Sequence, residues 1–200
     1  VAIGFDALTT AVDDDQNTAV GAYALNTTEA DNNSGLGYLA LYANTTGASN
    51  VAVGSSALQS NTTASNNTAV GYQAGYANTT GDYLTAVGWQ ALFSNTTGVQ
   101  NVAMGRYALG SNTTGGYNVA LGNQALISNT TASSNTAVGY QAGYSNTTGS
   151  PITVVGYQAG YSNTTGEIQA FGRLASYSNT TGVANSSFGL SALYANTTGG

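Results

Sequence analysis

The residues that could do chemistry are few and unevenly placed. Six of the eight acidic residues lie in the first 31 positions, and the chain has only two basic residues. Carboxylates held at one phase of a repeat repel each other unless a cation lies between them, and oxygen-rich loops suit Ca²⁺. We therefore expect a Ca²⁺ site at the acidic N-terminal end, formed by Asp13, Asp14, Asp15 and Asp31, with a solvated acidic end as the alternative.

Composition argues against catalysis. The chain contains no His, Cys or Lys, so Ser-His and Cys-His arrangements and a Lys nucleophile are all missing. A carboxylate pair for glycoside hydrolysis has a place only at the acidic end. Two arginines cannot neutralise a phosphate track, and no apolar run approaches the ~20 residues of a membrane span. We predict neither an enzyme, nor a nucleic-acid partner, nor membrane insertion in this segment.

The triplet Asn-Thr-Thr occurs eleven times, and each copy fits the acceptor pattern for N-linked glycosylation. The competing interpretation is a turn whose Asn and Thr side chains bond neighbouring backbone and stack in ladders. Sugars on every rung, ~4.8 Å apart, would collide. The candidate glycosylation sites are Asn44, Asn61, Asn78, Asn95, Asn112, Asn129, Asn146, Asn163, Asn179 and Asn196.

A column of tyrosines forms a second candidate site. Exposed aromatic rings with amides nearby suit stacking against sugars, although tyrosines stacked at one phase of a repeat also pack against each other. The candidate residues for binding a glycan or another surface are Tyr76, Tyr144, Tyr161 and Tyr177.

These residues recur because the whole chain is a repeat of the form N-[TV]-A-[VIL]-G-x-x-A-L-x-x-N-T-T-G-x-x. A fixed short period is the signature of a repeat architecture, so residues 1–200 are predicted to be a single repeat domain. The anchor glycine of A-V-G recurs twelve times, nine of the eleven spacings being 17 and two being 16. It falls at Gly4, Gly21, Gly37, Gly54, Gly71, Gly88, Gly105, Gly122, Gly139, Gly156, Gly172 and Gly189.

Every copy holds Gly, a polar triplet and β-branched residues, which disfavours helix and favours short strands with turns. We therefore predict an all-β fold, a repetitive parallel β-roll or β-solenoid of 12 coils of about 17 residues. Seventeen residues allow two strands of about five residues and two turns per coil.

Two columns predict how the coils pack. The residue before the anchor is apolar in all twelve copies, which predicts a buried ladder, and the residue three after it is always Ala, which predicts a close backbone approach. An interior lined with Ala is too thin to hold the apolar column before the anchor, or the Leu that follows the Ala in most copies, as well. If the apolar column faced water, its area would exceed the contiguous apolar surface that soluble monomers usually expose. We therefore expect copies of the chain to cover it around a three-fold axis.

The elements "NTAVG", "NVAVG", "NVAMG" and "NVALG", each followed three residues on by Ala, resemble the head repeats of trimeric autotransporter adhesins. The longer form "GYQAGYSNTTG" is also similar to repeats in tail-fibre-like proteins of phages and environmental bacteria. The resemblance covers essentially all 200 residues, although the period of 17 is longer than adhesin heads generally have. It implies a left-handed parallel β-roll, three chains to a rod, and a fibrous role.

The sequence thus predicts a structural and adhesive extracellular fibre or filament subunit at a cell surface or on a virion, cut from a longer fibre. It would associate with itself as a homotrimer, with end-to-end polymerisation and binding to surface glycans as further expectations. A phage tail-fibre shaft is the first alternative. An ice-binding β-solenoid is the second, with Asn and the second Thr of the triplet forming parallel files on one face.

Overall fold

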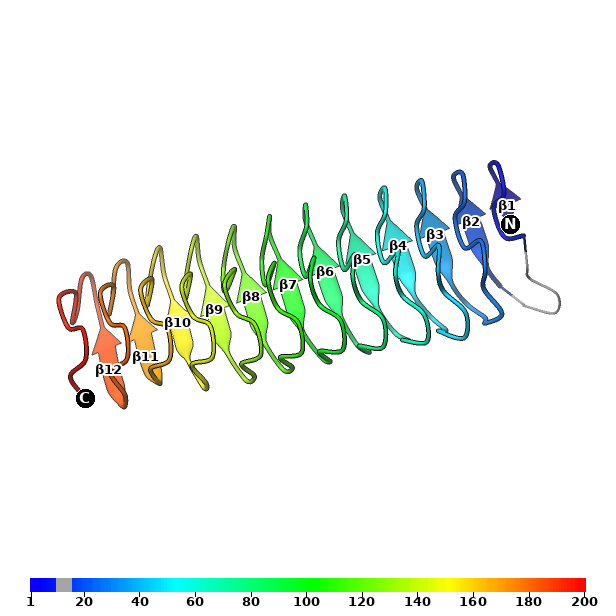
Figure 1. Ribbon diagram of the computed structural model, residues 1–200. Coiled ribbons are helices and arrows are strands. Elements are labelled where there is room, and N and C mark those ends of the chain that lie inside the picture. Colours follow the sequence, from blue (N-terminus) through cyan, green and yellow to red (C-terminus); the bar gives the residue numbers. More distant parts are fainter. Residues whose placement is uncertain (10–15) are drawn as a thin grey trace.

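The computed structural model of the chain describes residues 1–9 and 16–200. The coils stack into a rod, and each coil contributes one short strand to the same side (Figure 1). The described residues contain no helix. The strands run over Ala2–Ile3 (β1), Thr18–Val20 (β2), Ser34–Leu36 (β3), Val51–Val53 (β4), Thr68–Val70 (β5), Thr85–Val87 (β6), Val102–Met104 (β7), Val119–Leu121 (β8), Thr136–Val138 (β9), Thr153–Val155 (β10), Ile168–Phe171 (β11) and Asn185–Phe188 (β12).

All twelve strands form one parallel sheet in sequence order. Each strand pairs with the equivalent residues of its neighbour, so Ala69 of β5 lies opposite Ala86 of β6. This confirms the predicted parallel β-solenoid. The prediction of two strands of about five residues per coil is wrong. A coil has one strand of two to four residues, and the rest of the coil stacks through hydrogen bonds between turns, such as that from the Thr79 amide to the Thr96 carbonyl (2.9 Å).

The residue that follows each strand is the anchor glycine, because the next coil leaves no room there for a side chain. Gly88 has a φ of +132°, and a Cβ built on it would lie 2.7 Å from the carbonyl oxygen of Gly105 in the following coil. No L-residue fits such a contact or adopts that backbone readily. The recurrence of this Gly once per coil is therefore a steric requirement between stacked coils.

After the anchor, the backbone alternates in handedness. Gln90 and Leu92 have φ values of 53° and 51°, while Ala91 between them and Leu92 itself are both fully buried. Side chains alternate between the two faces only along extended backbone. The left-handed residues break that alternation, so consecutive Ala and Leu side chains enter the interior.

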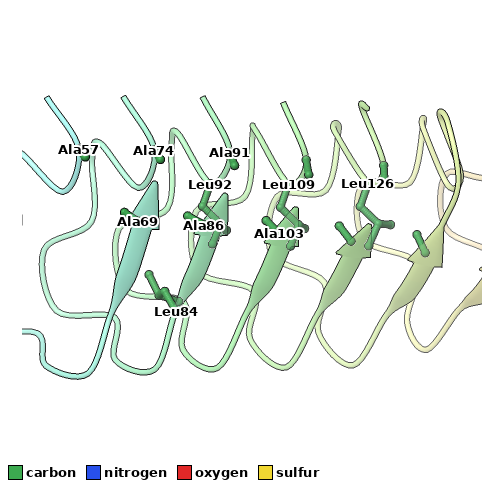
Figure 2. Packing of buried hydrophobic residues seen from close by; sticks show 14 of the residues in the cluster. Ala57, Ala69, Ala74, Leu84, Ala86, Ala91, Leu92, Ala103, Leu109 and Leu126 are labelled. Carbon is green, nitrogen blue, oxygen red and sulfur yellow. The ribbon is translucent and has the colours of Figure 1, made fainter. Parts of the chain in front are cut away.

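The interior consists of two Ala columns with a Leu column between them. Figure 2 shows Ala86 and Ala103 on the strands, Ala91 on the opposing segment, and Leu109 reaching into the space between. Residues at the always-Ala position, such as Ala91 and Ala108, are fully buried, and the close approach of two backbones there stays a prediction. The expectation that the interior is too thin for Leu is wrong.

Candidate functional site

The outward face of the sheet carries the apolar column that precedes the anchor glycine. We call this set the outward file. Sequence analysis predicted a buried ladder, and within a single chain that prediction is wrong, because the neighbouring Ala already occupies the inward side of each three-residue strand. Leu36, Val70 and Met104 are 39%, 37% and 44% exposed. The file consists of Ile3, Val20, Leu36, Val53, Val70, Val87, Met104, Leu121, Val138, Val155, Phe171 and Phe188.

A second column runs beside the outward file, two residues earlier in each coil. Its residue is Thr, Ser, Val or Gln, as in Thr68, Thr85 and Val102. Neither column contains a charged residue on any of the twelve strands. The sheet therefore presents a narrow, uncharged, partly apolar surface along the whole rod.

The Asn of nine of the eleven triplets lies inside the solenoid. The side chain of Asn95 is typical: its Nδ2 donates to Oδ1 of Asn78 (3.0 Å) and to the carbonyl of Gly98 (3.0 Å), and its Oδ1 accepts from Nδ2 of Asn112 (2.8 Å). Its exposed fraction is 0%. The triplet asparagines thus form the ladder that sequence analysis set against glycosylation.

Nine of the ten candidate glycosylation sites, from Asn44 to Asn179, are fully buried, and only Asn196 in the last coil is half-exposed. A glycan could be attached to a buried amide only before its coil closes. Glycosylation at these positions stays a prediction, with Asn196 the one candidate whose side chain reaches the surface of the folded rod.

A second asparagine ladder, which sequence analysis missed, lies at the start of each coil. The backbone amide of Asn118 donates to Oδ1 of Asn101 (2.9 Å), while Nδ2 of Asn118 donates to the carbonyl of Ala132 (2.9 Å). The signal for it was the Asn four residues before most anchor glycines. Both ladders satisfy buried backbone groups, as a polar interior requires.

The two threonines of the triplet point differently. The hydroxyl of Thr96 donates to the carbonyl of Thr113 in the next coil (3.1 Å), whereas Thr97 is exposed. Since Asn95 points inward, the proposed pairing of Asn and second-Thr files on one ice-binding face is wrong. One exposed threonine file remains on that side.

The tyrosine column forms face-to-face stacks. Tyr161 lies between Tyr144 and Tyr177, with ring centroids 4.9 and 5.1 Å away and interplanar angles of 12° and 8°, and Tyr76 stacks on Phe93 at 5.2 Å. Burial raises the pKa of the Tyr161 hydroxyl, and the nearby Tyr144 and Tyr177 add to the rise. Because both faces of Tyr161 are covered, a sugar can reach only its edge and hydroxyl.

Only one of the four acidic candidates, Asp31, lies within the described residues. Asp13, Asp14 and Asp15 lie outside the described residues, while Asp31 is exposed and its carbonyl accepts from the Ser49 amide (3.1 Å). Within residues 1–9 and 16–200, no three His, Cys, Asp or Glu side chains gather as metal ligands. The Ca²⁺ site stays a prediction. None of the described chain forms a helix long and apolar enough to cross a membrane.

No protein-family model matches the chain, and no curated protein or solved structure is significantly similar to it.

Proposed function

We propose that this chain is a rod-forming subunit of an extracellular fibre, and that it associates with copies of itself along the outward file. The observation that carries the proposal is the unbroken apolar column on the free face of a twelve-stranded sheet. Twelve rungs at ~4.8 Å extend over ~58 Å, and contiguous apolar surface of this kind marks an interaction site.

A second copy of the chain is the partner that matches this face best. The file repeats once per coil, so only a partner with the same axial period meets it equally at every rung. Two uncharged faces do not repel each other when they approach, and self-association along a symmetry axis is the commonest route to an oligomer. The resemblance to adhesin head repeats supports three chains, side by side and parallel, and a place at a cell surface.

The proposal is tested by the mass of the folded chain in solution. Light scattering on the wild type should give a multiple of the 20.0 kDa chain. The variant Val87→Lys with Leu121→Lys adds two charges to the outward file and should be monomeric. The matched variant Thr97→Lys with Thr131→Lys adds the same charges to exposed positions on another side and should keep the wild-type mass. A folded wild-type monomer would overturn the proposal.

A tail-fibre shaft would use the same assembly. It differs from an adhesin in what the rod joins at its ends. The resemblance of "GYQAGYSNTTG" to tail-fibre repeats supports this alternative. The rod and its self-association serve both roles alike.

An ice-binding role is a second candidate, because the outward face of the sheet holds two regular files of side chains, as at Thr68 and Val70 or Thr85 and Val87. The side chains of these files repeat every ~4.8 Å along the rod. Larger side chains such as Met104 and Phe171 interrupt the flatness of the face. Ice binding requires this face to be free, so thermal hysteresis from a monomeric rod would favour it over the fibre.

A further inference from the structure

The residue immediately after each anchor glycine forms a column with a higher-order repeat; we call it the post-glycine column. From the fifth coil it reads aromatic, aromatic, Arg, Asn, and then aromatic, aromatic, Arg again. The two groups are offset by four coils, the same offset that separates "NTAVGYQAGYANTTG" from "NTAVGYQAGYSNTTG". The members are Tyr72, Trp89 and Arg106 in the first group and Tyr140, Tyr157 and Arg173 in the second.

The backbone holds these residues in register on successive coils. The Gln90 amide donates to the Tyr72 carbonyl and the Tyr107 amide to the Trp89 carbonyl, both at 3.0 Å. The equivalent bonds in the second group run from Gln158 to Tyr140 and from Leu174 to Tyr157, both at 2.9 Å. The column is therefore continuous in space as well as in phase.

The two groups share their ring geometry. Tyr72 and Trp89 stack with centroids 6.1 Å apart and planes inclined by 18°, and Tyr140 and Tyr157 stack at 5.3 Å and 16°. The guanidinium of Arg106 lies 5.3 Å from the centre of the Trp89 ring, and that of Arg173 lies 5.9 Å from Tyr157. Each group is two stacked rings closed at one end by a guanidinium. In the first group the Arg106 guanidinium also lies 5.0 Å from the centre of the Tyr107 ring, where the second group has Leu174.

These groups are at the surface. Tyr72, Trp89, Tyr140 and Tyr157 are 45%, 38%, 43% and 47% exposed, and both arginines are exposed. A glutamine comes directly after each of these rings in the sequence, and the glutamine amides are bonded in pairs. Nε2 of Gln90 donates to Oε1 of Gln73 (2.6 Å), and Nε2 of Gln158 donates to Oε1 of Gln141 (2.8 Å). Aromatic edges, amides and a cation are thus presented together, twice.

The placement of charge singles out this column. The chain has a net charge of −6, yet its only two basic residues both lie here, at the same place in each group. In the described part of the chain their partners are aromatic rings and not carboxylates. An Arg stacked on a ring keeps its N–H donors for a ligand, and its planar fork fits a carboxylate or sulfate with two hydrogen bonds.

We propose that the two groups, Tyr72–Trp89–Arg106 and Tyr140–Tyr157–Arg173, are equivalent subsites for one acidic polysaccharide lying along the rod. The exposed ring edges would contact the apolar C–H surface of the sugars, the amides of Gln73 and Gln141 their hydroxyls, and the guanidinium groups a carboxylate or sulfate. Nucleic acid does not fit, because two cations cannot neutralise a track with a phosphate on every residue.

The four-coil offset makes the site bivalent. The subsites lie ~19 Å apart along the axis, so a polymer that engages both gains avidity that a short oligosaccharide does not. This site goes beyond the fibre proposal and does not depend on it. The post-glycine column lies after the anchor glycine of each coil, whereas the outward file lies before it. A monomeric rod would bind the polymer too.

The test is binding of the full 200-residue chain to three soluble polymers at low salt: polygalacturonate, dextran sulfate and uncharged dextran. We expect one or both acidic polymers to bind, uncharged dextran to bind at least about tenfold more weakly, and affinity to fall with added salt. Binding to polygalacturonate alone identifies a carboxylate ligand, and binding to dextran sulfate alone a sulfate ligand. Absence of binding to both acidic polymers, or equal binding of uncharged dextran, would overturn the proposal.

Variants assign the site. Arg106→Gln or Arg173→Gln alone should lower affinity about tenfold or more through lost bivalency, and the double variant should abolish binding. Trp89→Ser should weaken binding, whereas Tyr117→Ser, which removes a 60% exposed ring outside the column, should not. Arg106→Lys keeps the charge and the fold and should give an intermediate loss. A double arginine variant that binds like the wild type would contradict the assignment.

Discussion

Gly143 and Ile152 share one space inside the solenoid. A Cβ built on Gly143 would lie 3.2 Å from Cδ1 of Ile152 and 3.0 Å from Cδ2 of Leu126. Most coils have Leu at the position of Gly143 and Asn at the position of Ile152. Here the interior Leu is absent, and an aliphatic side chain from the start of the next coil fills the volume.

The same exchange occurs three times in the sequence, since Gly75 is followed by Leu84 and Gly160 by Ile168. The side chains meet in space at Gly160, where a Cβ would lie 3.0 Å from Cδ1 of Ile168, whereas the atoms nearest a Cβ on Gly75 belong to Leu58 and Ala69. Leu84, Ile152 and Ile168 are all buried. Because interiors are closely packed, the aliphatic side chains at Ile152 and Ile168 offset the volume lost at Gly143 and Gly160.

We predict strong energetic coupling between positions 143 and 152. Gly143→Leu alone should overpack the interior and cost about 1–3 kcal/mol. Ile152→Asn alone should also destabilise the rod, because it leaves a void beside Gly143. In the double variant, the sum of the two losses should be reduced by about 1 kcal/mol or more, as measured by the free energy of unfolding in urea. Strictly additive losses would show that the two side chains do not share this space.

The buried asparagine ladder should be a large source of stability. Asn95→Ala removes three hydrogen bonds and leaves the side chains of Asn78 and Asn112 and the Gly98 carbonyl each short of a partner. Each such loss in the interior costs about 1–3 kcal/mol, so we expect about 3 kcal/mol or more in total. Thr97→Ala, two residues away and exposed, should stay within about 0.5 kcal/mol. Equal effects of the two variants in urea unfolding would contradict the ladder's role.

The stacked tyrosines predict a loss of stability at alkaline pH. Burial raises the pKa of Tyr161 above its ordinary value of 10.0, so the folded state favours the protonated hydroxyl. That contribution is complete below the unfolded pKa and is lost as pH rises through the folded pKa. The thermal unfolding temperature should therefore fall less steeply with rising pH across this window for Tyr161→Phe than for the wild type. Tyr117→Phe, which changes an exposed tyrosine, should follow the wild type, and an unchanged slope for Tyr161→Phe would remove the basis for this prediction.

The period of the sequence was enough to predict the stacking, since a fixed spacing of equivalent residues leaves parallel pairing as the simplest solution. The packing inside a coil was less accessible. Alternation along a strand places Ala86 and Val87 on opposite faces, but it does not say which face is inside. The left-handed backbone at Leu92 cannot be read from a Leu, which rarely adopts it, and so the interior Leu column was assigned wrongly.

The same limit holds for the candidate sites. The repeat identifies Asn95 and Tyr161 as recurring polar and aromatic positions, but whether they bind a ligand or pack in a ladder depends on where their side chains point. The backbone of the turn sets that direction, and composition does not describe the turn. The post-glycine column carries a weak sequence signal, because only two of its members, Arg106 and Arg173, are charged. These two lie at the same position of coils that are four apart.

Directed disulfide cross-linking can locate self-association at the outward file. The wild-type chain has no cysteine, so Val87→Cys places a single thiol in the outward file, and Thr97→Cys places one on another side of the same coil. After mild oxidation of dilute protein, we expect covalent dimers for Val87→Cys and monomers for Thr97→Cys. Monomers for Val87→Cys, or equal cross-linking at both positions, would contradict self-association at the outward file.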